Sequence, residues 1–190
     1  MAITFKEYQE LSARTANKHI DEQVNYAMGL SGETGELVDI FKKHLFHSHP
    51  LPKDKIKKEA GDVLWYTSQL ARIFDLCFDD AFERLNKMNE TYGIIMAEGS
   101  PNRLLKISSL NLSYGSGNVS QFVDGIKYLG TCFYNVSSLE VNLRKVLKNL
   151  HCMIRLSGLT IEEVAEANIE KLKKRYPDGF DPEKSINRTE

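Results

Sequence analysis

The chain has 190 residues, enough for one domain or two small ones, and its 42% hydrophobic and 27% charged residues are typical of globular proteins. The 25 basic and 26 acidic residues nearly cancel, which argues against a nucleic acid polymer as partner. No apolar run approaches the roughly 20 residues that span a bilayer, so no membrane partner is expected. Three widely spaced cysteines and the lack of an apolar leader in Met1 to Lys18 predict a cytoplasmic protein with reduced thiols.

Apolar residues recur with helical periodicity in the first half of the chain. The second expected helix contains a looser stretch from Gly29 to Gly35, and two prolines in the tract 47–52 end it. The helices expected here cover Phe5 to Thr15, Val24 to Leu45, Lys53 to Ile73 and Phe78 to Tyr92.

The tract Gly93 to Asn102 is the best candidate for a boundary between two halves. Beyond it, Ser108 to Asn118 is rich in Ser, Asn and Gly, which predicts a loop, or a short helix followed by a loop. Thr160 and Glu163 form a capping box that starts the last helix. The remaining helices are expected over Val119 to Asn135, Val141 to Leu156 and Thr160 to Arg175, before an extended tail. No segment alternates like a strand, so we predict an all-α protein, a helical bundle of about seven or eight helices.

Two pairs of acidic residues have the i, i+3 spacing that places both members on one helical face. They are Glu33 with Glu36, and Glu59 with Asp62. If their helices pack antiparallel, four carboxylates converge, which is unfavourable without a cation. Such a set of oxygen ligands suits Mg²⁺ or Mn²⁺. Exposed acidic pairs are often merely solvated, but Gly32, Gly35 and Gly61 beside them indicate close approach by a ligand or another helix.

Other metal sites are less well supported by the residues. A di-iron carboxylate bundle normally uses Glu-x-x-His pairs, and here no histidine holds that position. The histidines at 44, 47 and 49 are expected to lie in a solvated loop.

Five stretches carry a resemblance when they are taken in order. They are Phe5 to Glu10, Gly29 to Glu36, Glu59 to Tyr66, Gly158 to Glu163 and Asn168 to Pro177. The first acidic pair is ExxE and the second is ExxD, with 22 residues between them. This ordered set resembles the MazG-like, all-α nucleoside triphosphate pyrophosphohydrolase superfamily, which also contains the dimeric dUTPases and dCTPases.

The resemblance implies a function and a set of site residues. All four acids would bind Mg²⁺, and a nucleoside triphosphate would be hydrolysed between its α and β phosphates to a monophosphate and pyrophosphate. By the same resemblance, Asn168, Lys171 and Arg175 would contact the nucleotide. The expected role is sanitation of the nucleotide pool, acting on a deoxy or non-standard nucleotide. A non-catalytic helical protein that binds nucleotides or partners is the alternative.

Aromatic and polar residues near the motifs have two readings. Trp65 and Tyr66 can pack in the core or stack on a base. On the first helix, Tyr8, Gln9 and Arg14 lie in a region that, by the resemblance, can approach the nucleobase. Phe180 and the tail from Asp181 to Glu190 are candidates to fold over the site or over a partner subunit.

About 85 residues lie between Ala71 and Gly158, where a single-domain member would run almost straight from one to the other. One explanation is a plain insertion. The other is an internal duplication, with residues 1–97 as a first MazG-like half and 104–190 as a degenerate second half. In the second half Asn118, Gln121, Val146 and Asn149 replace the acids, so the metal ligands would come from the first half and the phosphate contacts from the second. Such a chain would be a covalent pseudo-dimer, either monomeric or paired again as a homo-oligomer.

Overall fold

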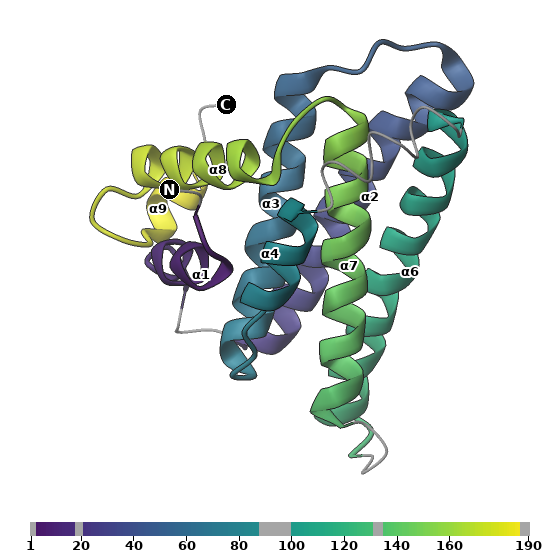
Figure 1. Cartoon of the computed structure of the whole chain (residues 1–190). Helices are drawn as coiled ribbons and strands as arrows, with labels where there is room; N and C mark the ends of the chain where they lie inside the picture. Colours follow the sequence, from purple (N-terminus) through teal and green to yellow (C-terminus); the bar gives the residue numbers. More distant parts are fainter. Residues whose placement is uncertain (1–2, 18–20, 88–99, 131–134, 187–190) are drawn as a thin grey trace.

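A computed structural model describes residues 3–17, 21–87, 100–130 and 135–186 (Figure 1). In these ranges the chain forms helices and no strand, which confirms the all-α prediction. The helices are α1 (Phe5–Ala13), α2 (Glu22–His47), α3 (Lys53–Ile73), α4 (Asp79–Lys87), α6 (Pro101–Lys127), α7 (Val136–Leu156), α8 (Ile161–Arg175) and α9 (Pro182–Ile186). None of the helices in these ranges combines the length and the apolar character that crossing a bilayer requires.

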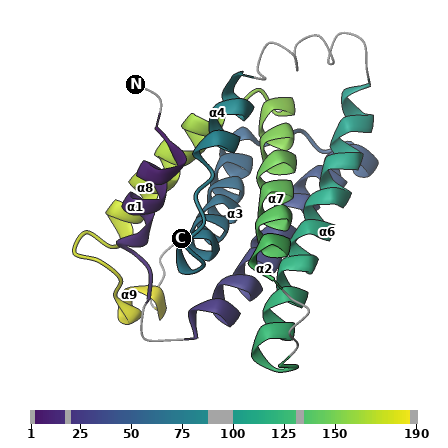
Figure 2. The same ribbon diagram turned by 60° about the horizontal axis from the view of Figure 1, so that its bottom comes forward.

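Four long helices form the central bundle (Figures 1 and 2). Helices α2 and α3 make one hairpin and α6 and α7 a second, and the hairpins meet through contacts of α2 with α6 and of α3 with α7. Leucines from all four helices are fully buried between them, at positions 37, 64, 112 and 147. Burial of such side chains stabilises the bundle by about 2 kcal/mol each.

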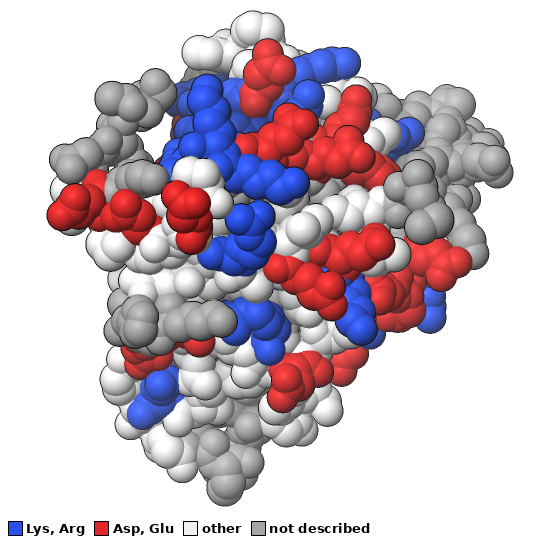
Figure 3. Space-filling view, turned by 90° about the vertical axis from the view of Figure 1, so that its left-hand side faces the viewer, with Lys and Arg blue, Asp and Glu red and all other residues white. Residues whose placement is uncertain are grey.

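Helices α1 and α8 pack together on another side of α3 (Figure 1). The capping box predicted for α8 is confirmed, since Thr160 Oγ1 accepts from the Glu163 backbone and Glu163 Oε2 from the Thr160 backbone. Basic and acidic side chains are interspersed on the face that carries α1 and α8, so this face has mixed charge (Figure 3). Helix α8 thus lies on the helix that contains Glu59 and Asp62.

The prediction of a loop at Ser108 to Asn118 is wrong, because α6 is continuous through this tract. Its small residues face neighbouring helices, as Ser108, Gly115 and Ser116 are buried. Tertiary packing therefore overrides the low helix propensity of Ser, Asn and Gly. In the same way α2 passes unbroken through Gly29 to Gly35.

Several predicted boundaries also differ from the structure. Helix α6 ends at Lys127, well before Asn135, and α7 begins at Val136, five residues earlier than expected. The tail is not wholly extended, since it contains α9. The predicted boundary tract from Gly93 lies mostly outside the described residues, as does the end of the helix expected to reach Tyr92.

Candidate metal and nucleotide site

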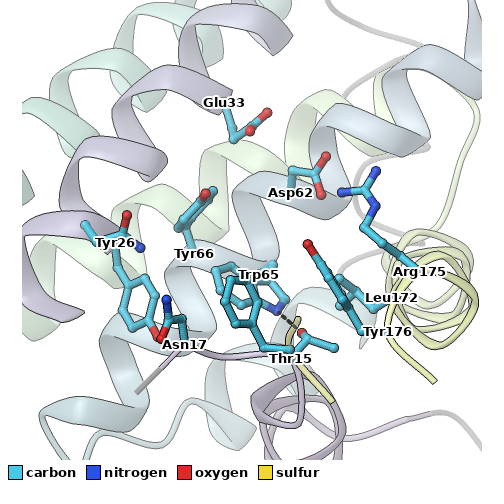
Figure 4. A pocket seen from close by; sticks show the side chains of 12 residues that line it. Thr15, Asn17, Tyr26, Glu33, Asp62, Trp65, Tyr66, Leu172, Arg175 and Tyr176 are labelled. Atoms are coloured by element: carbon cyan, nitrogen blue, oxygen red, sulfur yellow. Dashed lines mark hydrogen bonds between the residues drawn. The ribbon is translucent and has the colours of Figure 1, made fainter. Parts of the chain in front are cut away.

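Three of the four predicted acids meet where α2 lies against α3. One carboxylate oxygen from each of Glu33, Glu59 and Asp62 lies within 4.8 Å of those from the other two. Glu59 is only 1% exposed, while Glu33 and Asp62 are partly exposed and point toward the same space (Figure 4). Glu36 is exposed on α2, one turn beyond Glu33, and is not part of this trio.

The electrostatics of this trio favour a cation. Burial, followed by the charges of Asp62, Glu36 and Glu59, raises the pKa of Glu33 to about 7, against a smaller lowering by Lys171. Negative charge is therefore incompletely compensated at this place. Oxygen donors in close array are the ligands that Mg²⁺ and Mn²⁺ prefer, so the donor set fits such an ion.

Asp62 is held by two side chains from α8. Lys171 forms an ion pair with Asp62 Oδ1, and Asn168 Nδ2 donates to the same oxygen at 3.2 Å. Asn168 is 3% exposed, and its Oδ1 accepts a hydrogen bond of 2.8 Å from the Tyr8 hydroxyl. The structure thus places Asn168 behind Asp62, with both ends of its amide bonded to protein, and leaves Lys171 partly exposed.

The neighbouring glycines behave differently from one another. A Cβ atom on Gly61 would lie 3.0 Å from Cβ of Asn168, so the predicted close approach of another helix is found here. Beside Glu33 no other helix approaches in this way, because no atom lies within 4 Å of a Cβ built on Gly32 or Gly35. At these two positions α2 simply faces outward.

A pocket of about 340 Å³ opens beside Glu33 and Asp62 (Figure 4). Arg175, the last residue of α8, lies at its edge, so that a positive charge stands near the acids. Three aromatic side chains form one wall of the pocket. The ring of Trp65 stands edge-to-face to those of Tyr26 and Tyr66, with distances between ring centroids of 5.5 Å and 4.9 Å. Asn17, Asn25 and Phe180 also line it, and the Phe180 ring lies 5.5 Å from that of Tyr176.

Hydrogen bonds hold two of the three aromatic side chains in place. Trp65 Nε1 donates to Thr15 Oγ1 at 3.2 Å, and the Tyr26 hydroxyl donates to Glu22 at 2.9 Å. Trp65 therefore both packs against the core and lines the pocket. Sequence reasoning missed Tyr26, although it stands seven residues before Glu33 and hence on the same face of one helix.

The three residues considered for base contact, two in α1 and one at its C-cap, are bonded to protein in the structure. Tyr8 is fully buried against Asn168. Gln9 Nε2 donates to the backbone carbonyls of Ser68 and Leu76, both at 3.3 Å. Arg14 donates to the Pro177 carbonyl at 3.1 Å. None of these three lines the pocket beside Glu33.

Comparison with known proteins points to one family. The MazG nucleotide pyrophosphohydrolase domain matches residues 22–92, which include α2 and α3 with all four acids. A curated relative, the Gene 37 protein of Mycobacterium phage L5, is 35% identical over 79 residues, covering 38% of this chain and 69% of the phage protein. No solved structure matches the chain significantly. The residues of α8 lie outside the matched domain.

Proposed function

The chain belongs to the MazG nucleotide pyrophosphohydrolase family, and from this premise we propose that it cleaves a nucleoside triphosphate between the α and β phosphates. The products are a nucleoside monophosphate and pyrophosphate. The observation that carries the proposal is the trio of Glu33, Glu59 and Asp62 beside an aromatic pocket with Arg175 at its edge. A deoxy or non-standard nucleotide of the cytoplasmic pool is the proposed substrate.

In this proposal the acids hold Mg²⁺, or Mn²⁺ in its place. Glu33, Glu59 and Asp62 provide the core of the site, and Glu36, one turn from Glu33, is the proposed fourth ligand. When bound, the ion neutralises phosphate charge and lowers the pKa of a coordinated water. In the same proposal one of the glutamates also orients or deprotonates the attacking water.

The basic residues of α8 contact the phosphates in the proposed complex. Arg175 lines the pocket and Lys171 is partly exposed next to Asp62, so both can donate to phosphate oxygens. Asn168 is buried, is bonded to Tyr8 and Asp62 and does not line the pocket, so its proposed role changes from nucleotide contact to support of Asp62. The rings of Tyr26, Trp65 and Tyr66 offer apolar surfaces for the base.

The proposed halves, 1–97 and 104–190, cooperate in this site. The hairpin of α2 and α3 faces a hairpin of α6 and α7, and α8 packs mainly on α3 of the other half. At the positions of the second half that correspond to the acids, Val146 is fully buried, and Asn118 Nδ2 donates to Asn142 at 3.2 Å. These neutral side chains cannot replace the acids as ligands, which supports the proposal of one composite site per chain, as in a covalent pseudo-dimer.

The deciding experiment measures the products formed from a panel of NTPs and dNTPs with and without Mg²⁺, by ion-exchange chromatography. We expect Mg²⁺-dependent formation of monophosphate and pyrophosphate, reduced by about 100-fold or more in Glu59→Gln and Glu36→Gln. Glu166→Gln, an exposed substitution on α8, is the matched control and should leave the rate unchanged.

Other products or no products would contradict the proposal. Diphosphate with inorganic phosphate would place cleavage at the γ phosphate. Saturable Mn²⁺ and nucleotide binding without turnover of any nucleotide would favour the alternative, a non-catalytic nucleotide-binding protein.

A further inference from the structure

Three side chains from three helices form a continuous hydrogen-bonded chain behind the acidic trio. The hydroxyl of Tyr8 in α1 donates to Asn168 Oδ1 of α8 at 2.8 Å. Asn168 Nδ2 in turn donates to Asp62 Oδ1 of α3 at 3.2 Å. Tyr8 is 0% and Asn168 3% exposed, so water does not substitute freely for these partners.

The direction of each bond in this chain follows from chemistry. An ionised Asp62 only accepts hydrogen bonds, so the end of the Asn168 amide that faces it must be the NH₂ group. The carbonyl end then points the other way, into a buried region, and needs a donor. The Tyr8 hydroxyl is that donor. Without it the buried carbonyl end of the amide has lost its donor, so the orientation that presents Nδ2 to Asp62 is less strongly favoured.

Close packing of Asn168 against α3 leaves its side-chain amide little room to shift. Gly61 precedes Asp62 on α3, and a Cβ atom there would stand 3.0 Å from both Cβ and Nδ2 of Asn168. Asn168 therefore lies directly on the α3 backbone next to the ligand that it supports. Lys171 and Asn168 both donate to Oδ1, which leaves Oδ2 of Asp62 for a cation.

We infer that Tyr8 is a positioning residue of the metal site: through Asn168 it fixes the carboxylate of Asp62 in the orientation that binds the cation. The inference rests on the proposed function, because the role of Asp62 as a ligand is part of it. Burial, together with the charge of Asp62, raises the pKa of Tyr8 well above its ordinary value, so the hydroxyl keeps its proton.

The test uses the full-length Tyr8→Phe protein, which keeps the buried ring and removes only the hydroxyl. Mn²⁺ binding is titrated by electron paramagnetic resonance without nucleotide, and nucleotide turnover is measured over a range of Mn²⁺ concentrations. Partners of metal ligands contribute about 10–100-fold to metal affinity, so the Kd for Mn²⁺ should rise about tenfold. Turnover should fall at limiting Mn²⁺ and return toward the wild-type rate at saturating Mn²⁺.

Thr67→Val is the matched control, because it also removes a buried hydroxyl, one that donates to the Val63 carbonyl of α3 at 2.8 Å. Its Mn²⁺ affinity should equal that of the wild type even where its melting temperature is lowered as much as in Tyr8→Phe. Asn168→Asp provides a second variant, since a carboxylate beside Asp62 should change Mn²⁺ binding strongly whatever its effect on the fold.

The outcomes separate this inference from the proposed function. Equal Mn²⁺ affinity in wild type and Tyr8→Phe would overturn the inference and leave the metal site standing. An equal loss of affinity in Thr67→Val would also overturn it, because general loosening of α3 would then explain the effect. Failure of the wild-type protein to bind Mn²⁺ or Mg²⁺ would overturn the proposed metal site itself, and the inference with it.

Discussion

A Cβ atom on Gly29 would lie only 2.2 Å from Cε1 of Tyr66, so the tyrosine ring occupies the space that a side chain at position 29 would need. The ring of Tyr66 stands edge-to-face to Trp65, and both line the pocket beside the acids. A glycine of α2 therefore determines where the aromatic wall of α3 stands. This contact explains why a residue of low helix propensity occurs inside α2.

Gly29→Ala should displace Tyr66 and damage the pocket. We expect a loss of about 1–3 kcal/mol in the free energy of unfolding, because inserting a methyl group into a filled space forces the neighbours to move. The KM for the nucleotide should rise while Mn²⁺ affinity stays unchanged. Urea unfolding and steady-state kinetics measure the two effects.

Gly117→Ala is the control for that substitution. It lies within α6, and no atom is within 4 Å of a Cβ built there. Alanine should therefore stabilise the helix by up to about 1 kcal/mol through propensity alone. Equal effects at positions 29 and 117 would contradict the assigned role of Gly29.

The pKa of Glu33 predicts how stability depends on pH in the absence of divalent metal. The folded protein binds this proton more tightly than the unfolded chain, since the pKa is raised from 4.5 to about 7. The contribution of Glu33 to stability is thus fully present below pH 4.5 and is lost as the pH rises through 7. In EDTA, Glu33→Gln should therefore gain stability relative to the wild type between pH 5 and 8, by on the order of 1 kcal/mol given partial solvent screening.

Denaturant unfolding of both proteins at several pH values measures this difference, in which titrating groups that do not interact with Glu33 cancel. Adding Mg²⁺ at pH 8 should reverse its sign, because the ion stabilises the wild-type fold by binding to it. A stability difference that is constant from pH 5 to 8 would show that Glu33 has an ordinary pKa.

Arg175→Ala should lower kcat/KM for a nucleoside triphosphate by about tenfold or more, because a charge-assisted hydrogen bond to phosphate contributes about 1.5–3 kcal/mol. Mn²⁺ binding without nucleotide should not change, since Arg175 is not among the acids and their direct partners. Lys173→Ala removes the same charge from an exposed position in the same last turn of α8 and serves as control. Similar losses in the two variants would indicate a general charge effect.

Thr160→Ala should lower the free energy of unfolding by about 1 kcal/mol, the usual cost of losing a helix N-cap. Thr160→Ser keeps the hydroxyl that accepts from the Glu163 backbone and should remain close to the wild type. Thermal or urea unfolding checks both. If the free energy of unfolding of Thr160→Ala equalled that of the wild type, α8 would be held by its packing on α3 alone.

Local sequence determined most of the helices and the identity of the acidic residues. The helix predicted from Lys53 to Ile73 has those bounds in the structure, because two prolines, a clear apolar face and a polar opposite face are all local signals. The same reasoning gave a wrong prediction for Ser108 to Asn118, because the helix there depends on the burial of small residues against α7 and α2. Propensity is weak beside such packing.

The i, i+3 spacing predicted that each acidic pair shares one helical face, and convergence of the two pairs was expected only if their helices pack antiparallel. Only the tertiary structure decided which oxygens meet, since burial and neighbouring charge depend on the whole bundle. It also decided that Asn168 faces Asp62 and Tyr8, residues 106 and 160 positions away. Contacts across such separations leave no periodic trace in the sequence, because they follow from where α8 packs on α3.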